Sequence, residues 1–576
     1  MFAAMASSLD SSLIADRRDE TWEAEQKGRK KKTSRVFIEQ CCAAVRAAPA
    51  SGGGNKNRER DFASVVDQAH SQFKTMAGQQ SVNLPASQKT IDQLTDKCLI
   101  TVLSFVPHRD ILKRVSLVCK RWKKMCDDPA LWQVVLLRPH HDGLHVSGPD
   151  VVMQLIATRW SKLRWLELSP ELITPGIIQE LANRCPKLNY LTLDFSTAAQ
   201  LHDFTDLQSF PSRLRSLQLS LSENIFLEGL LRKIYTYISS VEMLHIVGTY
   251  EKIEDEEEEV YETVNIHKLK QYMPNLRVVN LWGVAFVTDE HVDSLSANCA
   301  KLECLCVNYC NKVTGNSVKQ VAARCKSITT LLVAHTNLGS ETVADIPWEN
   351  THIDELDVSG TELKSEAIKS MLSRLPYLRW LKAGYLENFD ADALLGWSDS
   401  GAPANLRYLD LDTCDGINDQ AMGEFFTRHG AQLKACILGG HHRLTENFWM
   451  KNIRKLPNAE TLVMGIAEDC CAKVTSKITV DQFIDQISRH CQNLRRLEIR
   501  WDDMTLRFAD KSSKFIDMMR LRCQKLHSIV LSDGEYYEIV RSNFERAGRE
   551  AVVRSTEMCH TNIHEYLRHY NNLLFN

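Results

Sequence analysis

The three cysteines Cys304, Cys306 and Cys310 have the spacing in this sequence that comes nearest to a metal-binding pattern. Thiolates together with an imidazole can hold zinc, and His335 follows them in the chain. Zinc sites read from sequence usually show paired ligands, and no second pair accompanies these cysteines. Cys304 and Cys306 would also lie on the same side of one strand. We therefore expect no metal site and no other cofactor.

Other patterns of catalytic residues are missing from the sequence. There is no phosphate-binding loop, HExxH helix, GxSxG turn, paired CxxC or kinase-like set. The adjacent Cys470 and Cys471 lie in an irregular segment, and the sequence leaves open whether they respond to oxidation. We expect a protein without catalytic activity of its own.

The composition is that of a globular protein with no bulk attraction for polyanions. Of 576 residues, 44% are hydrophobic and 25% are charged, and the formal net charge is −3. No apolar run approaches the ~18 residues of a membrane span, and the first residues do not resemble a secretion signal. We expect an intracellular protein, in the cytoplasm, the nucleus or both, with no membrane contact and mostly reduced cysteines.

A six-residue motif of the form LxxLxL recurs along most of the chain. It first occurs as LRWLEL at residue 163 and last as LHSIVL at residue 526, and most of its 14 copies follow at steps of 25 to 28 residues. Leucine-rich repeats have this motif and this period, and each unit adds a strand and a helix. The sequence therefore predicts an α/β solenoid over residues 138–532, with a concave parallel sheet and convex helices, and a helical cap over 533–576.

A set of cysteines shares one position in the repeat, three residues before the motif. Apolar residues stand four and seven residues before each cysteine, which is the spacing of one helix face. These thiols should therefore be small buried side chains at helix ends. The pattern resembles the cysteine-containing class of leucine-rich repeats, in which Cys310 and Cys414 would be turn cysteines. The helix-end set is Cys185, Cys299, Cys325, Cys491 and Cys523.

The motif also predicts which side chains face the concave side. Its fourth and sixth residues point into the core, so strand alternation turns the third, fifth and seventh residues to the concave face. Aromatic residues mixed with charges are typical of protein-binding surfaces. We expect a protein substrate to contact Trp165, Tyr190, Trp282, Trp380, Tyr408, Arg496 and Arg500.

Residues 89–137 follow a different pattern, that of three short amphipathic helices. Apolar residues recur at helical spacing from Leu94 to Val106, and Pro107 ends the first helix. A segment of about 45 residues has little capacity for a core of its own, so its apolar residues should dock elsewhere. The succession LSFVPHRDIL, RVSLVCKRWKKM and DPALW resembles the F-box over almost its whole length. Thr95 and Lys97 depart from the family pattern, which has a proline and an acidic residue there.

The F-box resemblance implies binding to a Skp-type adaptor, and through it to a cullin scaffold and a RING subunit. Trp122 would anchor this helical interface, since tryptophan combines a large apolar area with one N–H donor. Trp132, after Pro129, should close the turn against the next domain. The expected adaptor-binding residues are Leu94, Leu99, Val102, Leu103, Leu117, Val118, Cys119 and Trp122.

The F-box segment is locally basic, which raises nucleic-acid binding as an alternative. Residues 107–126 carry seven lysines and arginines against one acid, Asp110. No aromatic interleaving, zinc spacing or base-reading pattern accompanies them. We expect a solvated helix face, or complementarity to an acidic adaptor, and not nucleic-acid binding.

Two polar segments lie outside these domains or interrupt them. Residues 1–88 have the composition of a disordered tail. Within it, the basic run of residues 27–32 leaves nuclear import open. The acidic segment 251–262 interrupts the repeat spacing and is either a solvated loop or a site for a basic partner.

The combination of the two domains leads to one main functional hypothesis. F-box proteins with such repeats are substrate receptors of Skp/cullin/F-box ubiquitin ligases, so the resemblance implies that the repeats hold a protein substrate for ubiquitination. The alternative is an adaptor-bound scaffold or sequestering protein with no ligase role. The sequence does not settle whether a small molecule assists binding on the concave face.

Overall fold

The structure is a computed structural model that describes most of the chain from Leu94 onward. The expected disordered tail, the basic run 27–32, Cys470, Cys471 and all of the acidic segment except Tyr261 and Glu262 lie outside the described residues. The described residues are 94–138, 144–146, 148–222, 225–248, 261–466, 478–501, 505–507, 514–532, 534–544 and 552–554.

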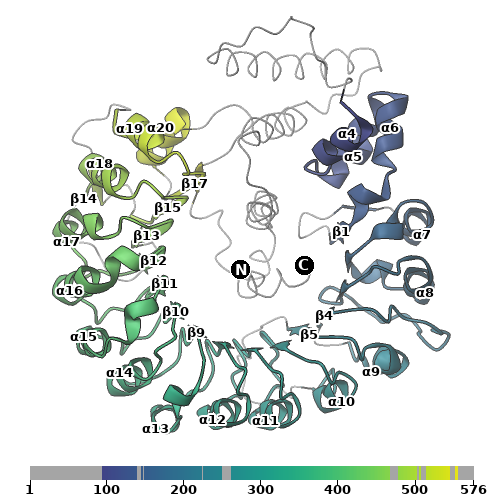
Figure 1. Cartoon of the computed structure of the whole chain (residues 1–576), viewed down its shortest axis with the longest axis horizontal. Coiled ribbons are helices and arrows are strands. Elements are labelled where there is room, and N and C mark those ends of the chain that lie inside the picture. The colour runs from purple at the N-terminus through teal and green to yellow at the C-terminus, as the bar shows by residue number, and fades with distance from the viewer. Residues whose placement is uncertain are drawn as a thin grey trace, which may run out of the picture.

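One parallel sheet runs through the described part of the chain, and its 16 strands lie side by side in chain order. The strands line the inner side of an arc, as Figure 1 shows. They are β1 (Val134–Leu137), β2 (Trp165–Leu168), β3 (Tyr190–Asp194), β4 (Ser216–Ser220), β5 (Met243–Val247), β6 (Val278–Asn280), β7 (Cys304–Cys306), β8 (Thr330–Leu332), β9 (Glu355–Asp357), β10 (Trp380–Lys382), β11 (Tyr408–Asp410), β12 (Ala435–Gly439), β13 (Thr461–Gly465), β15 (Arg496–Ile499), β17 (Ser528–Leu531) and β18 (Val552–Arg554).

The helices form the outer side of the arc, and three short helices stand at its N-terminal end (Figure 1). Those three are α4 (Asp96–Leu103), α5 (His108–Lys113) and α6 (Lys120–Cys126). The predicted α/β solenoid with a concave sheet and convex helices is therefore confirmed. The convex helices are α7 (Pro149–Thr158), α8 (Pro175–Arg184), α9 (Glu228–Ile234), α10 (Ile266–Gln271), α11 (Asp289–Asn298), α12 (Gly315–Arg324), α13 (Ser340–Ala344), α14 (Ser365–Ser373), α15 (Ala391–Asp399), α16 (Asp419–His429), α17 (Glu446–Asn452), α18 (Val480–His490), α19 (Lys514–Arg522) and α20 (Glu535–Phe544).

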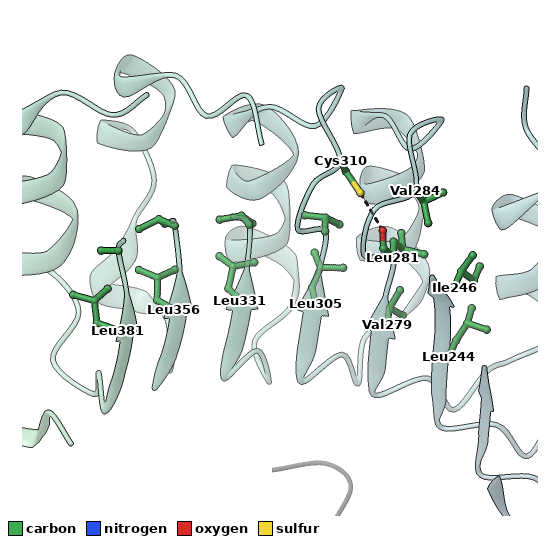
Figure 2. Packing of buried hydrophobic residues seen from close by; sticks show 14 of the residues in the cluster. Leu244, Ile246, Val279, Leu281, Val284, Leu305, Cys310, Leu331, Leu356 and Leu381 are labelled. Carbon is green, nitrogen blue, oxygen red and sulfur yellow. Dashed lines mark hydrogen bonds between the residues drawn. The ribbon is translucent and has the colours of Figure 1, made fainter. Parts of the chain in front are cut away.

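A single repeat shows how the motif produces this layering. Leu305 is the fourth residue of its motif and is 1% exposed, because it points between the sheet and the helices. The fourth residues of neighbouring motifs stack beside it in a continuous ladder, which Figure 2 shows from Leu244 to Leu381. Helix α12 then begins at the N-cap Thr314 and buries Val318 and Val321 against this ladder. Each repeat thus completes the core of its neighbour.

The cysteines have the two structural positions expected for them. The helix-end cysteines are buried C-caps, and the backbone N–H of Cys325, for example, donates to Val321 O at 2.8 Å. The turn cysteines bind a carbonyl of the preceding repeat: Cys310 Sγ lies 3.1 Å from Leu281 O (Figure 2), and Cys414 Sγ lies 3.1 Å from Ala383 O. In the repeat after Cys414, His441 takes this position and its Nε2 donates to a carbonyl at 2.6 Å.

The sheet extends by one strand at each end beyond the 14 motifs. Strand β1 lies within the segment assigned to the F-box and pairs with β2, so the sheet begins before residue 138. Strand β18 lies in the segment that we expected to be helical and pairs with β17. Its valines have high β-propensity, and Val552 is 4% exposed, so pairing at the sheet edge prevails over continuation of α20. Among the described residues no helix is long and apolar enough to cross a membrane.

Candidate adaptor-binding domain and concave binding face

The first helix of the F-box segment begins normally despite its departure from the family pattern. The hydroxyl of Thr95 accepts a hydrogen bond from the N–H of Cys98 at 3.3 Å, so Thr95 is the N-cap of α4. Arg121 of α6 forms an ion pair with Asp96 at 2.8 Å, which holds the start of α4 against α6. The threonine therefore keeps the helix start that the family's proline would provide.

The structure divides the predicted adaptor-binding residues into two groups. Leu99, Val102, Leu103 and Trp122 are buried in the chain's own core, and Trp122 is only 3% exposed. Trp122 therefore holds the three helices together from inside and does not project from them.

The remaining predicted residues reach the surface of the domain. Leu117 is 58% exposed and Cys119 is exposed, whereas Leu94 and Val118 are half-buried. Sequence reasoning missed Phe105, which is 36% exposed. The signal for it was present, because the F-box pattern has a phenylalanine at the turn where the first helix ends.

Trp132 joins the F-box segment to the solenoid, as the sequence predicted. Its side chain is fully buried, and its Nε1 donates to Cys126 O at 2.8 Å. His108 stacks on one part of the ring with centroids 4.7 Å apart, and the guanidinium of Arg159 lies 5.3 Å from its centroid. Arg159 also pairs with Asp127 at 2.6 Å. These contacts fix the direction in which the F-box segment leaves the sheet.

On the concave face, the third residues of the motifs form one row across the sheet. The register pairs Trp165 with Tyr190, and Trp380 with both Glu355 and Tyr408. In the N-terminal half of the sheet this row is buried: Trp165 is 9% exposed and Tyr190 is 2% exposed. Their rings lie 4.2 Å apart, and Tyr190 Oη donates to Gln218 at 2.8 Å. The two predicted residues lie on the expected face but offer little surface.

Arg138 is a concave residue that sequence reasoning missed. It follows β1, which lacks the LxxLxL motif, so no pattern marked it. Its guanidinium pairs with Asp194 at 2.5 Å and with Glu167 at 3.4 Å, and Trp165 Nε1 donates to Glu167 at 3.2 Å. A buried charge is tolerated here because both of its neighbours carry the opposite charge.

The loops that follow the strands form an aromatic ledge. Trp282 is half-buried, and its ring meets Tyr309 edge to face at 5.2 Å, while Tyr309 stacks on His335 at 4.4 Å. Tyr309, His335, Tyr385 and Thr413 all have φ between 52° and 62°, a left-handed conformation that is uncommon outside glycine. The backbone ladder imposes it, since each of their N–H groups donates to a carbonyl of the next repeat.

The central strands β9, β10 and β11 carry the most exposed part of the row. Trp380 is 37% exposed and lies between Glu355 and Tyr408 in the register. Lys382 Nζ lies 6.0 Å from the centroid of the Tyr408 ring. Together with Tyr385 and Asp410, these residues form a surface that we call the acidic-aromatic patch. Its members are Glu355, Trp380, Lys382, Tyr385, Tyr408 and Asp410.

The carboxyl groups of the patch are held in an unfavourable environment. Burial, only partly offset by Lys382, raises the pKa of Glu355 from 4.5 to about 7. Burial, followed by the nearby charge of Asp412, raises the pKa of Asp410 from 3.8 to about 7. Both groups therefore carry a full negative charge only above about pH 7, and Lys382 compensates that charge in part.

The two predicted arginines at the C-terminal end bind carboxylates of their own chain. Arg500 pairs with Glu498 at 2.8 Å and with Asp412 at 2.7 Å, and it is only 15% exposed. To reach Asp412 it crosses two strands where Gly439 takes the place of a side chain, since a Cβ there would lie 2.3 Å from Arg500 Nη1. Arg496 pairs with the same Glu498 at 2.8 Å and is 32% exposed. Burial opposes the effect, but both guanidiniums hold the pKa of Glu498 below its usual value.

Comparisons with known proteins match the N-terminal domain most clearly. The F-box-like family model matches residues 92–138. Human F-box/LRR-repeat protein 12 is 33% identical over 140 residues, which are 23% of this chain and 40% of that protein. Human F-box only protein 27 is 42% identical over 50 residues, which are 9% of this chain and 18% of that protein. The chain thus spans less than half the length of these curated relatives.

Two solved structures align with parts of this chain at low sequence identity. The yeast complex of Rad7 and Elc1 contains a chain with 13% identity and a TM-score of 0.38, over 79% of this chain and 92% of that chain. LegL7 of Legionella pneumophila, a leucine-rich repeat-containing protein, has 14% identity and a TM-score of 0.32, over 58% of this chain and 98% of that chain. The solenoid is assigned here from its own strand order and motif. The chain thus joins a domain similar to the F-box-like family, over residues 92–138, to a solenoid of repeated strands and helices.

Proposed function

We propose that this chain is the substrate-recognition subunit of a Skp/cullin/F-box ubiquitin ligase. The observation that carries the proposal is an F-box domain fixed through Trp132 to a solenoid with a concave face that carries exposed aromatic and charged residues. On this proposal the F-box binds a Skp-type adaptor, which connects the chain to a cullin and a RING subunit. The chain works in the cytoplasm, the nucleus or both.

The contribution of the chain to ubiquitination would be positioning. A substrate held on the concave face stays near the ubiquitin-conjugating enzyme, and this raises its effective concentration there. No residue of the chain takes part in the chemical step on this proposal. The apolar surface for the adaptor centres on Leu117 and Phe105, which are exposed, whereas Leu99, Leu103 and Leu131 are buried.

Reconstitution with a Skp-type adaptor, cullin, RING subunit and conjugating enzyme tests the proposal. The diagnostic variant is Leu117→Asp, because Leu117 is 58% exposed and its replacement leaves the core intact, whereas Trp122→Ala would open the core. We expect Leu117→Asp to abolish adaptor binding and ubiquitin transfer while the melting temperature stays unchanged.

The matched control is Leu521→Asp on α19, where leucine is 63% exposed at the other end of the arc. This variant should bind the adaptor as the wild type does. If wild-type chain binds the adaptor but recruits no cullin and supports no transfer, the chain is an adaptor-bound scaffold and the ligase proposal is wrong.

A further inference from the structure

The acidic-aromatic patch carries two carboxyl groups, Glu355 and Asp410, and one cation, Lys382, so it has a net negative charge when both carboxyls are ionised. Asp357 accepts a hydrogen bond from Asn308 at 3.2 Å, and Asp412 is paired with Arg500 at 2.7 Å. Glu355 and Asp410 share the charge of one cation, Lys382, and their hydrogen bonds are weaker. Glu355 accepts from the hydroxyl of Thr330 at 3.3 Å, and Asp410 accepts from the backbone N–H of Asp412 at 3.0 Å.

Exposed aromatic rings lie directly beside these two carboxylates. Trp380 is 37% exposed and Tyr385 is 55% exposed, whereas Trp165 on the same row of the sheet is only 9% exposed. Exposed tryptophan and tyrosine on a rigid strand framework are residues that dominate binding energy in protein interfaces. A ring face next to a carboxylate also favours a cationic side chain, because both attract positive charge.

The spacing of the two carboxylates limits what can bind them both. Glu355 and Asp410 lie two strands apart, and Asp410 is two residues further along the strand direction. Their Cα atoms are therefore about 12 Å apart by standard sheet geometry. Residues four positions apart in an extended peptide lie on the same side of the peptide and span about 13 Å. Trp380 lies between the two strands that carry the carboxylates.

We propose that the acidic-aromatic patch binds an extended segment of a partner protein that carries two basic side chains four residues apart, with an apolar residue midway between them on the same side of the segment. The basic side chains bind Glu355 and Asp410, and the apolar residue packs on Trp380. The identification of this partner as the substrate rests on the proposed ligase function. Nucleic acid does not fit, since its phosphates would be repelled by the same carboxylates.

A peptide titration with the full chain in complex with its adaptor tests the proposal. The probe is a fluorescein-labelled peptide of sequence GSRSLSRSG, and the measurement is fluorescence anisotropy at pH 8. We expect saturable binding, at least tenfold weaker for the double variant Glu355→Gln/Asp410→Asn and also weakened by Trp380→Ala. The peptide GSESLSESG should not bind.

The matched control is Glu341→Gln/Asp392→Asn, which makes the same charge change at exposed positions of α13 and α15. It should bind the probe like the wild type. No saturable binding of GSRSLSRSG by the wild type, or equal binding by Glu355→Gln/Asp410→Asn, would overturn the proposal.

A further variant decides whether the chain itself supplies the occupant. If the probe binds only after residues 27 and 29–32, all lysine or arginine, are replaced by serine, the patch belongs to the chain's own basic run and the partner proposal is wrong. Equal binding before and after this replacement supports an external partner.

The same reagents separate this proposal from the ligase function. The probe is fused to a lysine-bearing carrier, and ubiquitin transfer to the carrier is measured in the reconstituted ligase. Probe binding without ubiquitin transfer would support the peptide-binding site and refute the ligase function. Leu117→Asp should lose adaptor binding and still bind the probe, because the patch lies on β9 to β11.

Discussion

Two copies of the tetrapeptide LRWL, at residues 163 and 378, place a tryptophan at the same motif position in two regions of the sheet. Trp165 on β2 is 9% exposed, and Trp380 on β10 is 37% exposed. The first packs on Tyr190 and donates to Glu167, whereas the second stands between a carboxylate and a tyrosine. The motif determines the face on which a side chain lies, and the neighbours across the sheet determine whether that side chain supports the fold or is free to bind.

Replacing each tryptophan by alanine should give the largest difference between the two regions. Trp165→Ala removes a buried ring and a donor to Glu167, and we expect it to cost about 3 to 5 kcal/mol of unfolding free energy. Trp380→Ala removes an exposed ring and should cost less than about 1 kcal/mol. Melting temperatures and urea unfolding measure both, and equal losses would show that the two regions do not differ in this way.

A second contrast concerns the two arginines that share Glu498. Arg500→Ala leaves Glu498, which is 1% exposed, and Asp412 without their main cation, and we expect a loss of about 3 kcal/mol. Arg496→Ala removes a cation that is 32% exposed, so its effect should stay below about 1 kcal/mol. Adding Glu498→Gln should recover stability in Arg500→Ala and not in Arg496→Ala. A similar loss in the two single variants would contradict the assignment of Arg500 as the structural partner.

Much of this architecture could be predicted from the sequence because repeats make long-range structure local. The phase of the helix-end cysteines and the alternation within LxxLxL depend on residues close in sequence, so the face of Trp165 and Trp380 was predictable. Their exposure was not, because it depends on side chains of neighbouring strands.

Interactions that cross several repeats were equally hidden from the sequence. Arg500 meets Asp412 across two intervening strands, and the small size of Gly439 that allows this has no signature of its own. Strands β1 and β18 were missed because VVLL and VVR lack the motif and pair only when a finished sheet edge is available. The burial of Trp122 was also missed, because a helical pattern in the sequence does not distinguish a side chain in the domain's own core from one at an interface.

A pH titration of stability tests whether the two carboxyl groups of the acidic-aromatic patch have raised pKa values. Glu355 and Asp410 have folded-state pKa values of about 7, above their ordinary values of 4.5 and 3.8. Groups raised in this way favour the folded state while protonated, so their contribution is present at low pH and is lost as the pH rises through 7. The charged groups around them are Lys382, Asp357, Asp354 and Asp412.

The wild type should therefore lose stability relative to Glu355→Gln/Asp410→Asn as the pH rises from 5 to 8. Melting temperatures of both proteins across this range measure the difference, which we expect to amount to a few degrees at most for a chain of this size. The control Glu341→Gln/Asp392→Asn should follow the wild type at every pH. Parallel curves for wild type and patch variant would show that the two carboxyls titrate normally.

The smallest expected effect concerns Tyr385, the residue of the patch with a left-handed backbone. Tyr385 has φ 57° and is 55% exposed, so a Cβ at this position is strained and little packing depends on the ring. Tyr385→Gly should be more stable than Tyr385→Ala by about 1 kcal/mol, because only glycine adopts this conformation without strain. Tyr377 is 51% exposed and is not among the left-handed residues, so there the order should reverse and alanine should be the better replacement. If Tyr385→Ala and Tyr385→Gly have the same unfolding free energy, a Cβ at residue 385 does not strain the left-handed backbone of this turn.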